Sequence, residues 1–423
     1  MADVDHLLAS VPVPALVPVR QHFPATNISD VASTICAEVS GQGLLSGLPE
    51  GASVAIGVGS RGIAQLPLIV KTVVELVRSA GAKPFIVPAM GSHGGATAEG
   101  QVALLHHLGI TERGVGAPLR ATMEVVQLGS VRGGLPLYVD RYVAEADGVV
   151  VINRIKPHTN FRGPVESGLL KMLVVGLGKQ KGADAAHALG FEHMAAHVLA
   201  LSAAWLERLP LLFGVAVLEN AYEQTAVVSA IPPERLESEE RRLLDKARSL
   251  MPRILLDPLD VLVVDEIGKE ISGLGMAPNI TGRAPTQLLD IGFQVDKIAV
   301  LRLTRATDGN AAGIGLADVT TAAVEARMDR AKSYVNSLTS TTMASVKLPM
   351  VMRNDAMAIK AAVKTCHARD LNRVRAVRIR NTLQLEEIWV SEALLAEVAN
   401  HRDLEVAGQV APLVFDRAGN LRL

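Results

Sequence analysis

Cysteine, aromatic residues and net charge are all scarce in this sequence, and each shortage excludes a class of protein. Cys36 and Cys366 are the only cysteines among 423 residues, which excludes a disulfide framework and favours a reducing, cytoplasmic setting. The net charge of −1 and the lack of a basic block argue against nucleic acid as a partner. No apolar run reaches the roughly 18 to 20 residues of a membrane-spanning helix, so we expect no membrane association. The first residues, with Asp3 and Asp5, lack the basic region of a secretory signal.

Strands and helices alternate from about residue 53 onward, in a sequence that is 49% hydrophobic but only 3% aromatic. Apolar runs of strand length are separated by Gly-rich turns and amphipathic segments, and this alternation predicts a parallel sheet with right-handed crossovers. The expected strands include 53–59, 83–89, 148–152, 211–218, 261–265 and 298–303, and the expected helices include 66–79, 97–108, 168–188, 193–209, 316–328 and 355–366. The sequence therefore predicts an α/β fold.

The length of the chain, 423 residues, exceeds a comfortable single core, so two domains are expected. A proline-containing stretch at 252–258 marks the expected boundary. We predict an N-terminal Rossmann-like domain with a parallel sheet at 1–255 and a smaller C-terminal α/β domain at 256–400. The tail, 401–423, is expected to pack back on one of the two. Because open α/β sheets bind ligands beyond the carboxyl ends of their strands, we expect the active site in the cleft between the domains.

Cationic side chains and histidines are concentrated after the expected strand 148–152. His158 and Arg162 follow this strand directly, where a packed core would not accept ionisable groups that are neither paired nor bound to something. Lys171 lies in an apolar run, so it either extends its ammonium to water or serves as an amine nucleophile with a lowered pKa. Farther along, His187 and His193 are each either a metal ligand through a neutral imidazole or a hydrogen-bonded, half-buried side chain.

Two Gly-rich turns follow the first two expected strands of the sheet. Ser60 and Arg61 come after strand 53–59, where free amide groups and a guanidinium group could bind an anion. The glycine spacing is neither the dinucleotide-binding fingerprint nor a P-loop, and a tight turn with a surface arginine is the alternative. His93 follows strand 83–89 between small residues. It is either a base that works near neutral pH or a turn histidine bonded to a carbonyl group.

The expected second domain contributes a Gly-rich loop at 268–283. Its polar candidates are Lys269, Asn279 and Arg283. Such a loop suits closure over a ligand, while a long ordered connection is the alternative.

The ordered set of these motifs resembles the nickel-dependent lactate racemase family, whose racemases and epimerases use a nickel-pincer nucleotide. The matching elements are Ser60-Arg61 after the first strand, His93 after the second, Pro157-His158 after a later one, and then Lys171 followed by His187. Val58 stands where these racemases have an aspartate three residues before the arginine. The resemblance therefore implies a divergent member of the family.

The resemblance also implies roles for individual residues. Lys171 would be joined to the nucleotide through a thioamide, and His187 would ligate Ni(II). His93 and His158 would act as the two acid–base groups, and Arg61 would hold the substrate carboxylate or the nucleotide phosphate. The remaining expected cofactor contacts are Ser60, Arg162, Lys269, Asn279 and Arg283.

The activity implied by the resemblance is that of an isomerase, which racemises or epimerises a lactate-like 2-hydroxy acid or a sugar acid. The substrate hydrogen would leave as hydride to the cofactor and return on the other face. Cofactor-synthesis proteins are then expected partners, and a homodimer stays open. One alternative is a nucleotide-binding or maturation protein without turnover, which would not need a pair of opposed bases. Another is a nicotinamide-dependent dehydrogenase, against which the missing G-x-G-x-x-G weighs.

Overall fold

The computed structural model describes residues 2–131, 133–188, 190–286, 288–289 and 291–422. The chain divides into two compact units, one formed by Ala25–Met251 and the other by Met1–Pro24 together with Pro252–Leu423. The sequence analysis placed residues 1–24 in the N-terminal domain. The division differs there, because strand β1 (Leu16–Gln21) pairs antiparallel with β14 (Glu387–Ser391) and β15 (Leu404–Val406).

The unit formed by Ala25–Met251 is built on a five-stranded sheet in the order β3-β2-β6-β7-β8. The first four of these strands pair in parallel, and β8 is antiparallel to β7 at the edge. The strands are β2 (Ser53–Val58), β3 (Lys83–Pro88), β6 (Gly148–Arg154), β7 (Leu211–Glu219) and β8 (Thr225–Ile231). A separate antiparallel pair is formed by β4 (Val125–Val131) and β5 (Leu135–Asp140).

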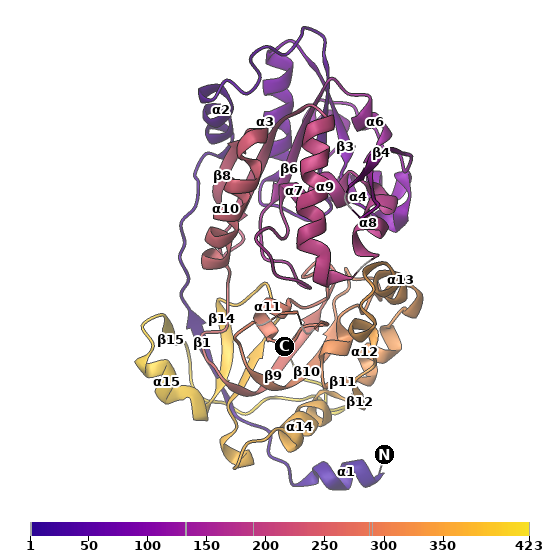
Figure 1. Ribbon diagram of the computed structural model, residues 1–423. Coiled ribbons are helices and arrows are strands. Elements are labelled where there is room, and N and C mark those ends of the chain that lie inside the picture. Colours follow the sequence, from indigo (N-terminus) through magenta and orange to yellow (C-terminus); the bar gives the residue numbers. More distant parts are fainter. Residues whose placement is uncertain (1, 132, 189, 287, 290, 423) are drawn as a thin grey trace. The chain divides into compact units, whose positions relative to one another are not determined.

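Both faces of this sheet are buried, because alternate strand residues enter two different hydrophobic clusters. Val54 and Ile56 join one cluster with helices α2 (Val31–Gly41) and α3 (Leu66–Ser79). Ala55 joins the other with α9 (Met194–Arg208) and α10 (Leu236–Leu250), and these two helices lie in front of the strands in Figure 1. The remaining helices of the unit are α4 (Ala98–His107), α5 (Glu112–Val115), α6 (Arg141–Ala144), α7 (Leu169–Lys171) and α8 (Lys179–His187). This layering is why the central strands read as continuous apolar runs.

The chain order creates a switch point between β2 and β6. From β2 the chain crosses to β3 on one side, and it later enters β6 on the other side. In doubly wound sheets, ligands bind beyond the carboxyl ends of the strands at such a point. The loops that begin after Val58 and Arg154 are therefore the first place to look for a site.

The second unit contains an eight-stranded mixed sheet in the order β12-β11-β10-β9-β13-β14-β1-β15. From β12 to β13 the pairing is parallel, and from β13 to β15 it is antiparallel. The strands not yet given are β9 (Leu259–Ile267), β10 (Val295–Leu303), β11 (Val319–Thr321), β12 (Met350–Met352) and β13 (Ala376–Ile379). Its helices are α1 (Ala2–Ala9), α11 (Pro278–Thr281), α12 (Ala322–Arg327), α13 (Arg330–Ser340), α14 (Asp355–Thr365) and α15 (Leu395–Asn400).

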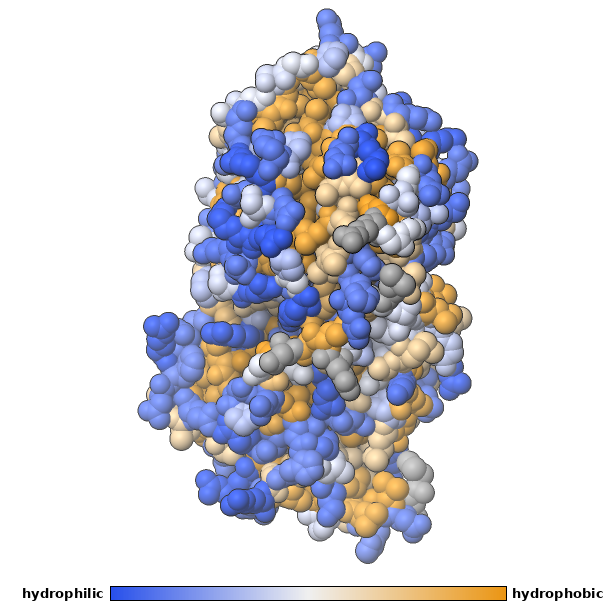
Figure 2. Space-filling view, in the orientation of Figure 1, coloured by the Kyte–Doolittle hydropathy of each residue, from blue (hydrophilic) through white to orange (hydrophobic). Residues whose placement is uncertain are grey.

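The predicted α/β fold with parallel sheets is confirmed, and two expected helices are corrected. The segment 316–328 contains strand β11 and is α-helical only from Ala322. The segment 168–188 is not one helix, because a π-helical turn at Met172–Gly176 separates α7 from α8. Within the part of the chain that the structure describes, no helix is both long and apolar enough to cross a membrane. Hydrophobic residues show among hydrophilic ones on the face drawn in Figure 2, as on most folded surfaces.

Candidate active site

Three predicted site residues follow the carboxyl ends of adjacent parallel strands. Arg61 follows β2, His93 follows β3 and His158 follows β6. Lys171 ends α7 and His187 ends α8, in the connection between β6 and β7. All five belong to the unit formed by Ala25–Met251.

His158 and Lys171 form a direct pair. The Nε2 atom of His158 lies 2.5 Å from Nζ of Lys171, while the backbone N–H of Asn160 donates to Nδ1 of His158 over 3.1 Å. Because Nδ1 accepts a hydrogen bond, a neutral imidazole carries its proton on Nε2. That proton then points at the lysine, whose amine can accept it only when unprotonated. The contact geometry therefore requires a neutral Lys171 amine with a lone pair.

The electrostatics of the pair agree with this geometry. Desolvation, followed by repulsion from Arg61, lowers the pKa of Lys171 to about 7. Desolvation and the neighbouring Lys171 charge hold the pKa of His158 well below its usual range. Phe161 and Phe191 supply much of the dry surrounding, with ring centroids 4.4 and 5.9 Å from that of His158. A lysine amine that is neutral near pH 7 is a nucleophile.

His187 is held in the tautomer that a metal ligand needs. Its Nδ1 lies 2.6 Å from the carbonyl oxygen of Ala183, and because a carbonyl only accepts, Nδ1 carries the proton. Nε2 is then the nitrogen with a lone pair, the usual arrangement of a metal-bound histidine. Burial, followed by repulsion from Lys171, lowers the pKa of His187 to about 4, so the ring is neutral. His193, the alternative ligand, is exposed and lies beside His197 with 5.9 Å between ring centroids.

His93 is bonded to the turn that follows β2. Its Nδ1 lies 2.5 Å from Oγ of Ser60, and its backbone N–H donates to the carbonyl of Met90 over 3.1 Å. The two Gly-rich turns predicted from the sequence are thus brought together by a hydrogen bond.

Cationic groups dominate the carboxyl ends of β2 and β6. Arg154 forms an ion pair with Glu219, whereas the pKa of Lys156 is held well below its usual value, first by the Arg154 charge and then by desolvation, Arg61 and Lys171. Burial also lowers the pKa of Arg61. Such a concentration of positive charge in a desolvated setting favours an anionic ligand, a phosphate or a carboxylate.

The His158 loop is braced by Glu166, a buried carboxylate that sequence reasoning missed. One oxygen of Glu166 accepts the backbone N–H of His158 over 2.6 Å, and the other accepts a guanidinium N–H of Arg248 over 2.7 Å. Arg162, an expected cofactor contact, donates to the carbonyl oxygen of His158 over 2.8 Å. In this structure Arg162 therefore supports the histidine loop, and its predicted cofactor contact stays a prediction.

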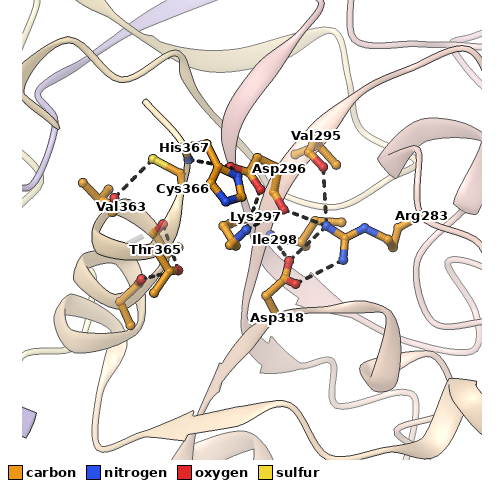
Figure 3. Close-up of polar contacts among 12 residues, drawn as sticks. Arg283, Val295, Asp296, Lys297, Ile298, Asp318, Val363, Thr365, Cys366 and His367 are labelled. Atoms are coloured by element: carbon orange, nitrogen blue, oxygen red, sulfur yellow. Dashed lines mark hydrogen bonds and ion pairs between the residues drawn. The ribbon is translucent and has the colours of Figure 1, made fainter. Parts of the chain in front are cut away.

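The expected contacts from the 268–283 loop belong to the other unit, where Arg283 and Lys269 have partners. Arg283 donates to both carboxylate oxygens of Asp318 over 3.2 and 3.1 Å, and to the carbonyl of Asp296 over 2.9 Å, as Figure 3 shows. Nζ of Lys269 donates to the carbonyl of Gly273 over 2.6 Å, and Asn279 lies in α11. Their predicted roles toward a cofactor stay predictions.

The donor set fits a nucleotide that brings most of its own metal ligands. No cluster of three or more His, Cys, Asp or Glu suited to a metal ion occurs among the residues that the structure describes. A metal held through His187 alone would need further ligands from the bound group. A lysine-tethered pincer would provide soft donors for Ni(II), and the neutral amine of Lys171 would suit its attachment.

The segment that carries these residues is similar to a known protein family. It is an α/β unit with a site at the switch point of a parallel sheet. Residues 53–198 match the family model described as the lactate racemase N-terminal domain, the family that the motifs of this segment resemble. Among solved structures, the lactate racemase apoprotein from Thermoanaerobacterium thermosaccharolyticum is similar at 15% identity and a TM-score of 0.40, over 59% of this chain and 66% of that chain. No curated protein matches.

Proposed function

We propose that the protein is an isomerase that racemises or epimerises a 2-hydroxy acid and carries a nickel-pincer nucleotide on Lys171. The observation that supports this most directly is the His158–Lys171 pair, whose hydrogen bonding requires a neutral amine. The family match over residues 53–198 supports the class of reaction. When bound, such a nucleotide supplies a hydride acceptor, which no side chain provides.

The side chains of the site bind anionic groups and exchange protons. Arg61 and Lys156 are suited to hold anionic groups, the substrate carboxylate or the nucleotide phosphate, because they lie in a desolvated cationic region. His93 and His158 are the groups to exchange the hydroxyl proton of the substrate, one for each enantiomer. Both rings come from loops at the carboxyl ends of parallel strands. General acid–base groups of this kind contribute about 10²–10⁴ to a rate.

The attachment is tested by producing the protein with and without cofactor-synthesis proteins and measuring intact mass and nickel content. The expected result is an adduct of one modified mononucleotide that peptide mass spectrometry maps to Lys171. Lys171→Ala should lack the adduct, whereas Lys181→Ala, at an exposed position of the same helix region, should retain it. His187→Ala should keep the adduct and lose nickel.

The reaction is tested by screening 2-hydroxy acids that carry deuterium at the α-carbon. Internal return of the hydrogen predicts racemisation with deuterium retained in the product, and His93→Ala and His158→Ala should each lower the rate by about 10²–10⁴. An unmodified, metal-free protein that racemises such acids at full rate would overturn the proposal.

A further inference from the structure

A second lysine of the site region, Lys179, is fully buried and belongs to a polar network. Lys179, Asp140 and Gln101 each have 0% exposure. Burying an amine and a carboxylate is costly unless both are paired and hydrogen-bonded. A network of this kind at the edge of a candidate site therefore needs an explanation beyond packing.

Three oxygen atoms surround Nζ of Lys179. Nζ donates to the carbonyl of Pro88 over 2.6 Å and to Oε1 of Gln101 over 3.1 Å, and it lies 3.0 Å from Oδ2 of Asp140. An ammonium group has three donors and no acceptor, and two hydrogen bonds and an ion pair with a carboxylate favour the protonated form of this lysine. Lys179 is therefore an unsuitable nucleophile, in contrast to Lys171.

Gln101 connects this lysine to the turn that carries His93. While its carbonyl oxygen accepts from Lys179, its amide nitrogen donates to the carbonyls of Gly91 and His93 over 2.9 and 3.3 Å. The backbone N–H of Gly91 in turn donates to the carbonyl of Gly176 over 3.0 Å, the last residue of the π-helical turn. The His93 turn is thus tied to the segment that begins at Lys171.

The same lysine also starts the helix that ends at His187. Lys179 is the first residue of α8 and has a φ of +54°, a left-handed conformation that is strained for a residue with a Cβ. Asp140 fixes the chain just before α8, because its backbone N–H donates to the carbonyl of Leu177 over 2.7 Å. The network therefore fixes both the entry of the chain into α8 and the position of that helix against β3 and β5.

We infer that Lys179, with Gln101 and Asp140, is a positioning residue that sets the His93 turn against the segment from Lys171 to His187. The inference rests on the proposed function, since it assumes that His93 and the Lys171–His187 pair act on one substrate. A static polar network suits this task because its hydrogen bonds define one geometry. Displacements of about 1 Å at a reacting group can lower a rate by about 100-fold.

The test uses two changes in the network and one matched control. Gln101→Met keeps the volume of the side chain but removes the bonds to the His93 turn. Lys179→Met combined with Asp140→Asn removes both charges, and the asparagine oxygen can still accept the N–H of Tyr142 that caps α6. Arg378→Met combined with Asp265→Asn removes a comparable buried ion pair in the other unit, without any link to the His93 turn.

The first measurement needs neither cofactor nor substrate. Carbethoxylation of His93 by diethyl pyrocarbonate is followed by peptide mass spectrometry, with the exposed His106 as internal reference. In both network variants the His93 rate should change by about two- to tenfold relative to His106, the factor by which losing one hydrogen bond shifts a conformational population. The control variant should leave the ratio unchanged, even if it lowers the melting temperature.

The second measurement uses the loaded enzyme. The network variants should retain the Lys171 adduct and a near-normal KM, while kcat falls about 10- to 100-fold. An unchanged His93 labelling ratio in a folded Gln101→Met protein would overturn the positioning role, whether or not the protein is a racemase. If labelling changes as expected in a protein without adduct or racemisation, the proposed function fails and the structural link to His93 remains.

Discussion

At the scale of single residues, the site depends on how neighbours select one protonation state. The N–H of Asn160 fixes the proton of His158 on Nε2, and the carbonyl of Ala183 fixes the proton of His187 on Nδ1. The His158 ring therefore donates toward Lys171, whereas the His187 ring keeps a lone pair on Nε2. Neither tautomer can be read from the sequence, because each depends on a backbone group placed by the fold.

The unusual state of Lys171 leads to a pH-dependent prediction. Because its pKa is lowered to about 7, the amine fraction should be half-maximal near pH 7 and should rise with pH. In competitive labelling with trace acetic anhydride, Lys171 should reach half of its maximal rate near that pH, well below the pH needed by a typical lysine amine of pKa about 10.4. Peptide mass spectrometry reads each site, with Lys181 as the exposed reference. Identical pH profiles at the two lysines would contradict a neutral Lys171.

Glu240 gives a second prediction at this scale, for stability. This carboxyl is fully buried, its Oε2 accepts the backbone N–H of Leu170 over 2.9 Å, and burial raises its pKa to about 7. A raised carboxyl pKa favours the folded state fully below the unfolded value of 4.5, and this stability is lost as the pH rises through about 7. The loss approaches about 3 kcal/mol.

Glu240→Gln keeps an oxygen for Leu170 but cannot ionise. Relative to wild type, the variant should gain up to about 3 kcal/mol in free energy of unfolding between pH 5 and pH 8. Denaturant unfolding at a series of pH values measures the difference. A constant difference across the range would show that Glu240 does not titrate on folding.

Sequence reasoning selected the candidate site residues, but it missed the residues that support them. His93, His158, Lys171 and His187 stood out because a strand end or an apolar run is an unusual place for them. Glu166 and Gln101 lie in ordinary polar contexts, and only the fold shows what they hold. Glu240 did carry a signal, since it lies on the buried face of α10 with Leu236, Leu243, Leu244 and Ala247, but the many charged residues around it in the sequence obscure that signal.

At the scale of elements, the connection from Lys171 to His187 is the feature that sequence periodicity described least well. Its apolar run predicted one helix, whereas the structure inserts the π-helical turn Met172–Gly176. Such turns are often associated with functional sites. Here the turn lies between the lysine and the histidine. Glycines allow the close packing that follows, because Cβ atoms at Gly176 and Gly178 would lie 2.8 and 2.2 Å from carbonyl oxygens of Ala89 and Val174.

Gly178→Ala tests whether the backbone between the π-helical turn and α8 is tightly constrained. The added methyl group would meet the carbonyl of Val174 at 2.2 Å, so the backbone must move, and the expected cost is about 1–3 kcal/mol. The Lys171 labelling profile should change as well, since the lysine precedes the turn. Gly41→Ala is the control, because its Cβ would have nothing within 4 Å at the end of α2. If both substitutions changed the free energy of unfolding equally, the backbone at Gly178 would accommodate a methyl group without strain.

At the scale of the whole molecule, composition and alternation were enough to predict the α/β class, since buried parallel strands need apolar runs. The path of the termini was not predictable in the same way. Strand β1 is short and contains Pro18, Arg20 and Gln21, so its sequence alone is a weak strand signal. Its place in the sheet is set by partners almost the whole chain length away. Long-range antiparallel pairing of this kind leaves no local pattern.

Deleting residues 1–24 should therefore affect the distant carboxyl-terminal strands and leave the candidate site intact. β1 lies between β14 and β15 in the sheet, and Gln21 donates to the carbonyls of Arg253 and Leu385 over 3.1 and 2.7 Å. Without β1, hydrogen exchange should become faster in Glu387–Ser391 and Leu404–Val406, because their backbone groups lose partners. Exchange in β2 and β6 serves as the internal reference and should not change, nor should the pH profile of Lys171 labelling. Loss of protection in β2 and β6 to the same extent would show that the two units unfold as one cooperative body.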